Sequence, residues 1–343
     1  MGTAIGELIE SEREEIDLAF LSGRKVGIDS YNILYQFLSS IRGQDGTPLM
    51  DSEGRVTSHL TGLLYRTVNL LEKGIKPVFV FDGKPSELKM KTLQERVKIR
   101  TEAEKKHKDA LEKGDMEEAK KYGSRALKLT KEMVEEAKKL VELLGLPMVE
   151  APSEGEAQIA HMVMKGELYG CVTQDYDALL FGAPVLLRNV ASTGRRKVPG
   201  KNLYIDISPE KIELERVLKS LNITRRKLIW LGILIGTDFN EKFPRIGPKT
   251  ALELVREHDS FEEIISKTKH GPEFDYKDIE ELFMKPKTTA DYTIKFSAPQ
   301  KEGVIELLCE EHDFSEERVK SALSKLEAKA SEKGEQSRLG QWV

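Results

Sequence analysis

The sequence has little cysteine and no long apolar run. Its two cysteines, Cys171 and Cys309, are too few for the disulfide framework of a small secreted domain. No segment reaches the roughly 18 consecutive apolar residues of a membrane span. The six histidines show no zinc-ligand spacing with the cysteines. The start, MGTAIGELIESEREE, is acidic and lacks an apolar signal core, so we expect a soluble cytoplasmic protein without a membrane partner.

An excess of basic residues is also absent. Lysine and arginine together number 54 against 58 acidic residues, which gives a formal net charge of −4. Spread evenly, that charge argues mildly against nucleic acid, so the position of the charges matters more than their sum. With 343 residues, 39% of them hydrophobic and 33% charged, the chain is predicted to be globular and long enough for one large core or two modest ones.

Three aspartates follow segments with a strand pattern. Asp29 ends the strand of RKVGIDSYNILYQFL, Asp82 ends that of GIKPVFVFDGKP, and Asp175 ends that of GELYGCVTQDYDALLFG. The segments APVLLRNV and KNLYIDI are predicted to be further strands, and helical patterns lie between the strands. This alternation predicts an α/β fold with a central, mostly parallel sheet flanked by helices. Ligands bind beyond the carboxyl ends of such strands, where all three aspartates are expected.

The segment between Lys84 and Lys131 is rich in helix formers and poor in large apolar residues. Because it cannot bury much surface, we expect it to project from the core as helices. Composition alone favours an ordinary solvated, charged helix. From Leu221 onward the chain reads as helical, with an apolar helix, a loop that carries Asp238, a turn and a second helix.

Seven carboxylates are predicted to converge on one edge of the sheet. Singly, each has an ordinary explanation, because Asp29 and Asp177 suit helix N-caps and Glu154 and Glu156 favour a helix N-terminus. Together they would repel one another unless cations lay among them. Oxygen ligands suit Mg²⁺ or Mn²⁺ rather than zinc, and a pair of such ions hydrolyses phosphodiesters by in-line displacement. The set is Asp29, Asp82, Glu154, Glu156, Asp175, Asp177 and Asp238.

Over nearly its whole length the chain resembles the archaeal flap endonucleases, which are structure-specific 5′ nucleases of replication and repair. The motifs that carry the resemblance are YQFLSSIRGQDGTPLMDSEGRVTSHLTGLLYRT, VFDGKP, APSEGEAQ, QDYDALLFG and EEHDFSEERV, in this order. It implies a PIN-like nuclease core with a helical arch and a helix–turn–helix element for DNA. The expected parts of one nuclease domain, 1–330, are 1–85 and 133–215 for the core, 86–132 for the arch, 216–265 for the helix–turn–helix and 266–330 for a C-terminal helical part, followed by a flexible tail, 331–343.

The resemblance also assigns catalytic roles. It implies that the seven carboxylates bind two Mg²⁺ ions, with Mn²⁺ as a possible substitute. Lys89 and Arg96 fall at the base of the arch, where family members steer and polarise the scissile phosphate. The residues expected to be catalytic are Lys89, Arg96, Asp29, Asp82, Glu154 and Asp177.

Further positions match DNA contacts of the family. Tyr35 matches an aromatic that stacks on a nucleotide, with a core tyrosine as the alternative. Arg42 and Arg66 match duplex or phosphate contacts, with ordinary surface arginines as the alternative. Arg318, in DFSEERV, matches the segment that pockets a one-nucleotide 3′ flap.

The segment FPRIGPKTALELV resembles the family's helix–turn–helix element, which usually binds K⁺ through backbone carbonyls. Gly247 allows the backbone to approach a phosphate, and Lys249 adds charge beside the free N–H groups of the following helix. The family usually has glycine where Arg245 stands. The arginine side chain either blocks close approach or reaches another phosphate, so the K⁺ site is left open.

The tail QSRLGQWV resembles the sliding-clamp peptide. Gln336, Leu339 and Trp342 fit its pattern, and Val343 stands where the second aromatic belongs. The alternative is a frayed terminus with a chance tryptophan.

These observations predict a monomeric, metal-dependent 5′ flap endonuclease, with 5′–3′ exonuclease activity, that acts on branched DNA. Removing the seven site carboxylates from the net charge of −4 leaves +3, so the remaining surface is mildly basic. A non-catalytic junction or clamp adaptor is disfavoured by the seven intact acids. A DxD phosphatase is also disfavoured, because it would need its Asp-x-Asp on the first strand, whereas Asp175 and Asp177 come late in the chain. A related RNA-cutting nuclease is the nearest rival, but the duplex-gripping turn and the clamp tail favour DNA.

Overall fold

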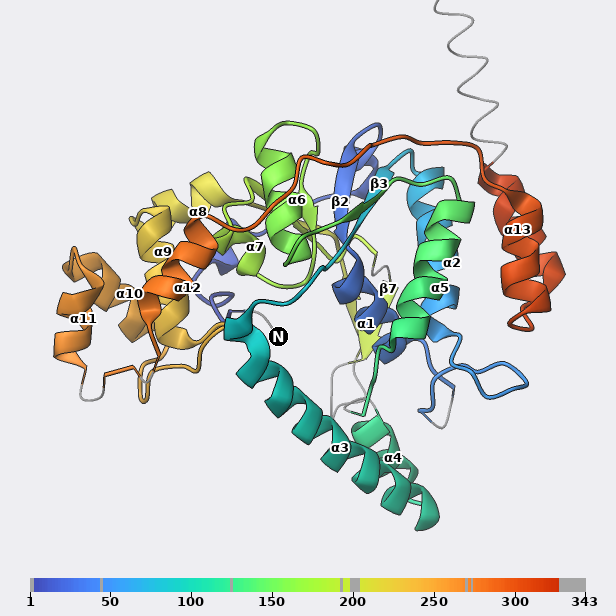
Figure 1. Cartoon of the computed structure of the whole chain (residues 1–343), viewed down its shortest axis with the longest axis horizontal. Coiled ribbons are helices and arrows are strands. Elements are labelled where there is room, and N and C mark those ends of the chain that lie inside the picture. The colour runs from blue at the N-terminus through green and yellow to red at the C-terminus, as the bar shows by residue number, and fades with distance from the viewer. Residues whose placement is uncertain are drawn as a thin grey trace, which may run out of the picture.

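A computed structural model of the chain describes residues 3–43, 46–123, 126–191, 194–197, 204–268, 271–272 and 274–326. Within these ranges a seven-stranded central sheet carries helices on both faces (Figure 1). Its strands, in spatial order, are β1 (Glu14–Glu15), β9 (Glu210–Glu213), β6 (Val185–Arg188), β5 (Cys171–Val172), β2 (Lys25–Asp29), β3 (Lys76–Phe81) and β4 (Met148–Glu150). The five from β6 to β4 pair in parallel, and β9 and β1 extend the sheet with antiparallel pairings. The predicted mostly parallel sheet is confirmed.

The central strands separate two hydrophobic cores. Along β3, Val78 and Val80 face one core, whereas Phe79 and Phe81 face the other, as the two-residue period of a strand requires. The phenylalanine side is covered by α1 (Ser30–Ser40), α2 (Ser58–Glu72) and α5 (Lys131–Leu143). The valine side is covered by α6 (Gly155–Met164), α7 (Asp177–Leu180), α8 (Leu214–Leu221) and α9 (Arg225–Ile235). A sheet buried on both faces explains why its strands are apolar without alternation.

Helix α6 packs closely on β2 because Gly27 has no side chain. A Cβ atom there would lie 2.5 Å from Ile159 and 2.8 Å from Leu168. Any larger residue would therefore push α6 away from the sheet, and α6 carries two of the predicted site carboxylates at its start.

Some strand predictions were wrong in extent or place. β5 ends at Val172, so Asp175 lies in the loop that follows and not at the strand's last residue. The KNLYIDI strand, β8 (Tyr204–Ile207), pairs with β7 (Gly194–Lys197) in a separate two-stranded sheet. The sequence reading also missed β1, β4 and β9, which are short and carry charged residues.

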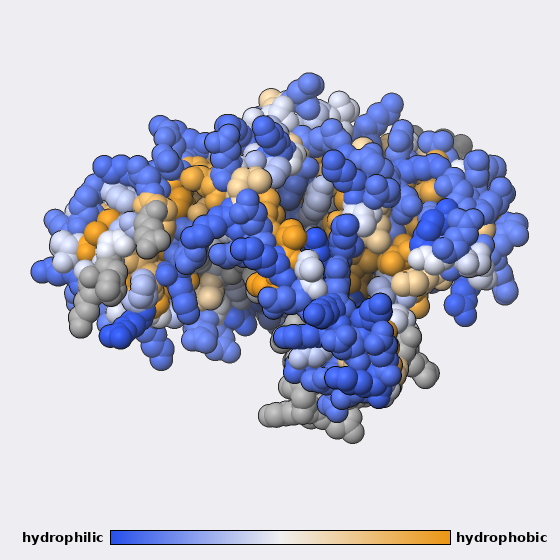
Figure 2. Space-filling model, turned by 60° about the horizontal axis from the view of Figure 1, so that its bottom comes forward, coloured by the Kyte–Doolittle hydropathy of each residue, from blue (hydrophilic) through white to orange (hydrophobic). Residues whose placement is uncertain are grey.

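The predicted helical projection is confirmed. A 3₁₀ turn, η3 (Glu87–Lys89), leads into α3 (Met90–Glu112), and α4 (Met116–Gly123) returns beside it. The two helices leave the body together (Figure 1). Only Ala103 and Ala110 of α3 are buried, and the surface of this part is almost wholly hydrophilic (Figure 2). We call residues 87–123 the arch.

The predicted helix–turn–helix is also present. α9 is followed by a loop that carries Asp238 and by α10 (Pro248–Glu257). α11 (Phe261–Lys267) and α12 (Tyr276–Met284) pack beside them around a cluster of aromatic rings that includes Phe243 and Phe261.

The C-terminal part, predicted to be helical throughout, contains a long extended segment. Residues 286–300 cross the body between α12 and α13 (Lys301–Ile305), on the side away from the arch (Figure 1). The buried amide of Gln158 fixes this segment, because it donates to Thr289 O at 3.0 Å and accepts from Thr289 N at 2.8 Å. The backbone of the extended segment thus hydrogen-bonds to a side chain and to neighbouring parts of the chain. Local helix propensity gives no sign of such distant partners.

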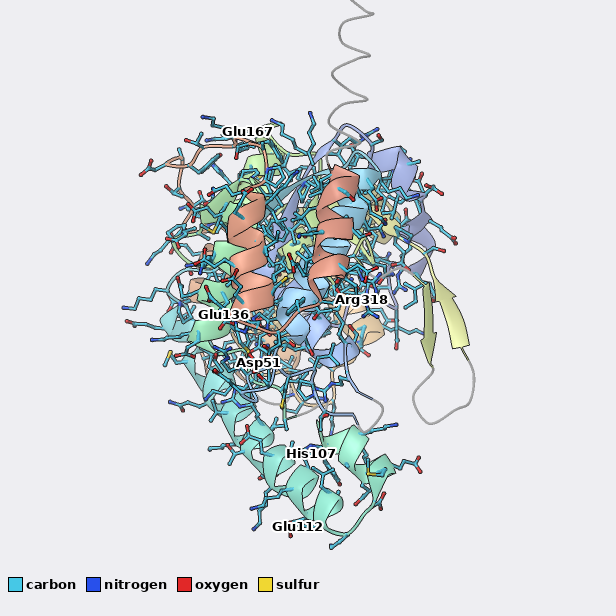
Figure 3. The ribbon with its side chains drawn as sticks, turned by 90° about the vertical axis from the view of Figure 1, so that its right-hand side faces the viewer. Asp51, His107, Glu112, Glu136, Glu167 and Arg318 are labelled. Atoms are coloured by element: carbon cyan, nitrogen blue, oxygen red, sulfur yellow. The ribbon has the colours of Figure 1, made fainter. Side chains whose placement is uncertain are left out.

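Past α13, the π-helical turn η4 (Glu306–Glu310) and a helix at 316–326 lie against α2 and α5. A buried polar network holds the connection between them. His312 Nδ1 lies 3.1 Å from Asp51 Oδ2, and His312 Nε2 lies 3.6 Å from Glu136 Oε1. His59 of α2 contacts the other oxygen of Glu136 at 3.0 Å. Figure 3 shows Asp51 and Glu136 beside this connection.

Candidate active site

Two site aspartates mark the carboxyl ends of neighbouring parallel strands. Asp29 is the last residue of β2, and Asp82 follows the last residue of β3. Asp29 is also the N-cap of α1, since its Oδ1 accepts a hydrogen bond of 3.0 Å from Asn32 N. The cap uses one carboxylate oxygen and leaves Oδ2 facing Thr173, at 3.1 Å. Capping and ligand binding are therefore compatible at this residue.

The glycine between Glu154 and Glu156 sets the position of both. Gly155 N donates to Asp82 Oδ1 at 2.7 Å, and a Cβ atom on Gly155 would lie 2.6 Å from that same oxygen. The start of α6 can approach the end of β3 this closely only with glycine at this position. Glu154 is the N-cap residue of α6, but its side chain makes no capping hydrogen bond.

The second acidic pair comes from the loop after β5. Asn32 Nδ2 donates to Asp175 Oδ2 at 3.0 Å. Asp177 is the first residue of α7, and the N-cap position belongs to Tyr176, so the helix-cap explanation of Asp177 was wrong. Asp177 Oδ1 instead accepts from Thr3 N at 2.7 Å and from Thr3 Oγ1 at 2.5 Å, and the residue is buried.

Two basic residues at the base of the arch reach into the carboxylates. Arg96 donates to Asp238 at 2.5 Å. Lys89 contacts Glu154 directly and lies 3.7 Å from Asp238. The Lys89 side chain is only 13% exposed, against 35% for Arg96. These contacts join the arch to α6 and to the loop after α9.

Burial and mutual repulsion raise the pKa values of the carboxylates beside β2. Burial, followed by the charge of Asp82, raises the pKa of Asp29 to about 8. Burial, and then Asp29 and Asp175, raise the pKa of Glu156 well above its ordinary value. The Thr173 hydroxyl lies 2.9 Å from Glu156 as well as 3.1 Å from Asp29, yet it has one hydrogen to donate. The carboxyls of Asp29 and Glu156 thus share the one hydrogen of the Thr173 hydroxyl.

The same effects act on the other side of the site. Burial, and then Glu154, raise the pKa of Asp82 to about 6. Burial, with Asp238 as the main repelling charge, raises the pKa of Asp177 to about 6 although Thr3 opposes the change. For Lys89, burial alone lowers the pKa, but the surrounding carboxylates, Glu154 foremost, outweigh it and raise the pKa. All seven predicted carboxylates thus act on one another electrostatically.

This donor set suits hard divalent cations. It consists of carboxylate oxygens, which Mg²⁺ and Mn²⁺ prefer, and a cation among them would relieve the repulsion that raises their pKa values. Within the described ranges, no three acidic, histidine or cysteine side chains are placed to hold an ion as they stand. Lys89 and Arg96 provide the compensating charge in this arrangement. The residues therefore fit such a cation by the chemistry of their donor atoms.

Comparison with known proteins identifies the family of the chain. The family model of the XPG N-terminal domain matches residues 3–103, and that of the XPG I-region matches residues 145–238. Flap endonuclease 1 of Pyrococcus abyssi is 55% identical over 343 residues, covering 100% of this chain and 98% of the relative. The chain belongs to the flap endonuclease family.

Solved structures of the flap endonuclease fold agree with the architecture. Flap endonuclease-1 from Methanococcus jannaschii matches with a TM-score of 0.77 and 42% identity, covering 97% of this chain and 100% of that one. The catalytic core of Rad2 in complex with DNA substrate matches with a TM-score of 0.70, over 95% and 100% of the two chains. At 23% identity, the second match concerns the fold alone. The predicted nuclease core of α/β type is confirmed.

The residues predicted to contact DNA lie in different settings. Tyr35, on α1, is 42% exposed, so the core alternative is wrong. Arg66 is part-buried on α2, and Arg318 is exposed on the outer C-terminal helix (Figure 3). Arg42 is half-buried, and its guanidinium donates to the carbonyl oxygens of Leu38, Gly46 and Gly123. Arg42 thereby ties α1 to the end of α4, and its contact with DNA stays a prediction.

At the helix–turn–helix, Gly247 is the N-cap of α10, and among the described residues, its chain neighbours aside, no atom lies within 4 Å of where its Cβ would be. This open space suits close approach of a phosphate, and Lys249 is exposed beside it. Arg245 has φ of 62°, the left-handed region in which glycine is free of strain. That conformation suits the glycine that the family resemblance implies for this position. The residues predicted to bind a sliding clamp, Gln336, Leu339, Trp342 and Val343, lie outside the described ranges.

Four residues that organise the site were missed by the sequence reading. Each holds a carboxylate through a hydrogen bond, and none is a charged residue or part of an obvious spacing. Gly155 alone had a visible signal, as the only residue between two glutamates. The four are Thr3, Asn32, Gly155 and Thr173.

Proposed function

We propose that this protein is a structure-specific 5′ flap endonuclease that hydrolyses phosphodiester bonds at branched DNA junctions. The observation that carries the proposal is the convergence of seven carboxylates at the carboxyl edge of the sheet, with Lys89 and Arg96 of the arch reaching into them. We include 5′–3′ exonuclease activity, because a recessed 5′ end presents the same bond beside the same duplex. A monomer, acting in the cytoplasm where archaeal relatives keep their DNA, is part of the proposal.

Two Mg²⁺ ions, or Mn²⁺ in their place, would supply the charge that activates a water and stabilises the leaving oxygen. The protein's own residues position that charge. Asp29, Asp82 and Glu154 hold one side of the site through β2, β3 and α6. Asp175 and Asp177 hold the other side through the loop after β5. Because these elements meet at one edge of the sheet, they bring the carboxylates close together.

Lys89 and Arg96 are placed to exchange partners when substrate binds. Both now pair with carboxylates, Glu154 and Asp238. With Glu154 and Asp238 holding a cation, the side chains of Lys89 and Arg96 would be left to contact the scissile phosphate. Such donors act where negative charge develops, which is the largest electrostatic contribution to many reactions.

Duplex binding is assigned to the surface beside the site. Phosphates are expected at the start of α10, where Gly247 leaves room and Lys249 adds charge. Tyr35 is exposed for stacking on a base. Arg66 and Arg318 are assigned to duplex and 3′-end contacts, as the family resemblance implies. Occupation of a K⁺ site near Arg245 is not part of the proposal.

Cleavage of one labelled double-flap DNA tests the function. In Mg²⁺, we expect a single major cut close to the junction, and in EDTA we expect none, because the carboxylates then lack their cations. The product is read on a denaturing gel under single-turnover conditions. An RNA flap of the same sequence and an unbranched duplex serve as controls. Full activity in EDTA, or equal cutting of the unbranched duplex, would contradict the proposal.

We also propose that residues 336–343 bind a sliding clamp, on the strength of the Gln336, Leu339 and Trp342 pattern. Deleting these residues is expected to abolish stimulation of cleavage by the clamp and to leave basal cleavage intact. The measurement is the cleavage rate with and without the clamp protein. If the deletion lowers basal and stimulated rates equally, the tail belongs to the nuclease itself.

A further inference from the structure

Asn32 joins the two halves of the carboxylate site through three hydrogen bonds. Its backbone N donates to Asp29 Oδ1 at 3.0 Å. Its side-chain Nδ2 donates to Asp175 Oδ2 at 3.0 Å, and its side-chain Oδ1 accepts from Gln174 N at 3.2 Å. This residue of α1 therefore hydrogen-bonds to the carboxylate at the end of β2. It also hydrogen-bonds to the backbone of Gln174 and to the side chain of Asp175 in the loop after β5.

The partners fix the orientation of the Asn32 amide. An ionised carboxylate only accepts hydrogen bonds, and the Gln174 N–H only donates. Exchanging the oxygen and nitrogen of the amide would place donor against donor and acceptor against acceptor. The side chain thus has one satisfactory orientation, and in that orientation it faces Asp175 with its N–H.

The position of Asn32 in α1 explains why its side chain is available for this role. It is the third residue of the helix, where glutamate or glutamine commonly folds back onto the N-cap residue. Asparagine is shorter, and here its amide extends across to the neighbouring parallel strand's loop. β5 contributes only two residues to the sheet, and in the loop that follows, Asn32 adds to the hydrogen bond that Arg188 Nε donates to Gln174 O at 3.3 Å.

We propose that Asn32 is a positioning residue that sets the carboxylate of Asp175 relative to that of Asp29 for cation binding. This inference rests on the proposed function, since it concerns the same metal site. Residues that hydrogen-bond to metal ligands fix the ligands' orientation, and their loss typically weakens metal affinity or activity about 10- to 100-fold. Without the Asn32 side chain, the Asp175 side chain and the 173–175 loop would adopt more conformations in the cation-free protein. Binding a cation would then cost more conformational entropy.

The test uses Asn32→Leu, which keeps nearly the same volume but can neither donate nor accept. Mn²⁺ is titrated into the metal-free protein without DNA, and free Mn²⁺ is counted by electron paramagnetic resonance. We expect the affinity to fall about 10- to 100-fold. In single-turnover flap cleavage, the half-saturating Mg²⁺ concentration is expected to rise by a similar factor, and most of the wild-type rate is expected to return at high Mg²⁺.

The control is Ser39→Ala, an exposed residue of the same helix whose hydroxyl donates to Gln36 O at 2.9 Å. It is expected to match the wild type in both assays. Asn32→Ala is the second variant if Asn32→Leu does not fold. A variant that melts earlier yet keeps wild-type Mn²⁺ affinity and Mg²⁺ dependence would show that Asn32 is only structural, and the inference would be wrong. Failure of the proposed function is distinct, because the wild type itself would then neither bind Mn²⁺ nor cut.

Discussion

Lys89→Ala is expected to slow the chemical step of flap cleavage by about 10²–10³, the usual cost of losing one charged or hydrogen-bonding partner of the transition state. Lys89 is nearly buried at the base of the arch and contacts Glu154, so its charge faces the carboxylates that we propose bind the cations. Affinity for flap DNA should change little, because most of the phosphate contacts lie elsewhere. Single-turnover rates and equilibrium binding measure the two effects separately.

Arg96→Ala is expected to behave in the same way, because Arg96 reaches Asp238 from the next turns of α3. Lys91→Ala is the matched control. Lys91 belongs to the same helix, but its 2.6 Å pair with Glu241 is exposed, with side chains 69% and 64% accessible. Its loss should leave the chemical rate unchanged. If Lys89→Ala and Arg96→Ala weaken binding and leave the rate intact, both residues are ordinary backbone contacts.

The parts of the site that follow from local patterns were predicted well. Asp29 and Asp82 come directly after apolar strand segments, and parallel strands end at one edge, so their convergence follows from the alternation of strands and helices. The projection of α3 and α4 follows from composition, since a segment with few large apolar residues cannot be buried. The roles of Lys89 and Arg96 came from family resemblance, because a charge on a helix does not reveal which way it faces.

The parts that depend on distant contacts were not predictable. Thr3 holds Asp177 across 174 positions of sequence, and the Gln158 amide fixes the extended segment at Thr289 across 131. Neither residue type stands out in a sequence. Arg42 shows the opposite difficulty. The family resemblance implies a duplex or phosphate contact, which stays a prediction, and the fold directs the guanidinium to three carbonyl oxygens.

Asp177→Asn is expected to separate chemistry from folding and binding. Asn retains the oxygen that accepts from Thr3 N and Oγ1 but removes the negative charge that a cation needs. Cleavage should therefore fall by orders of magnitude at any Mg²⁺ concentration. Affinity for flap DNA should hold or rise, most clearly at low salt, because one negative charge facing the phosphates is gone.

Stability gives the third readout for Asp177→Asn. The pKa of Asp177 is raised to about 6, so ionising this carboxyl costs folding free energy once the pH rises above the unfolded value, and the full cost is reached above about pH 6. In EDTA at neutral pH, the variant should therefore melt at the wild-type temperature or above it. Asp177→Ala, by contrast, leaves the N–H and hydroxyl of Thr3 without their acceptor. Its free energy of unfolding should fall by about 1–3 kcal/mol, so it should melt at a lower temperature.

Asp291→Asn is the control for charge alone. Asp291 is exposed on the extended segment at 286–300, on the side of the body away from the arch (Figure 1). The same change of charge there should leave the cleavage rate and the affinity for flap DNA nearly unchanged, because Asp291 is exposed and salt screens the charge of an exposed side chain. Asp177→Asn protein that folds normally and cuts at the wild-type rate would refute the ligand assignment. Asp177 would then serve only to anchor Thr3 and the N-terminal segment against α7.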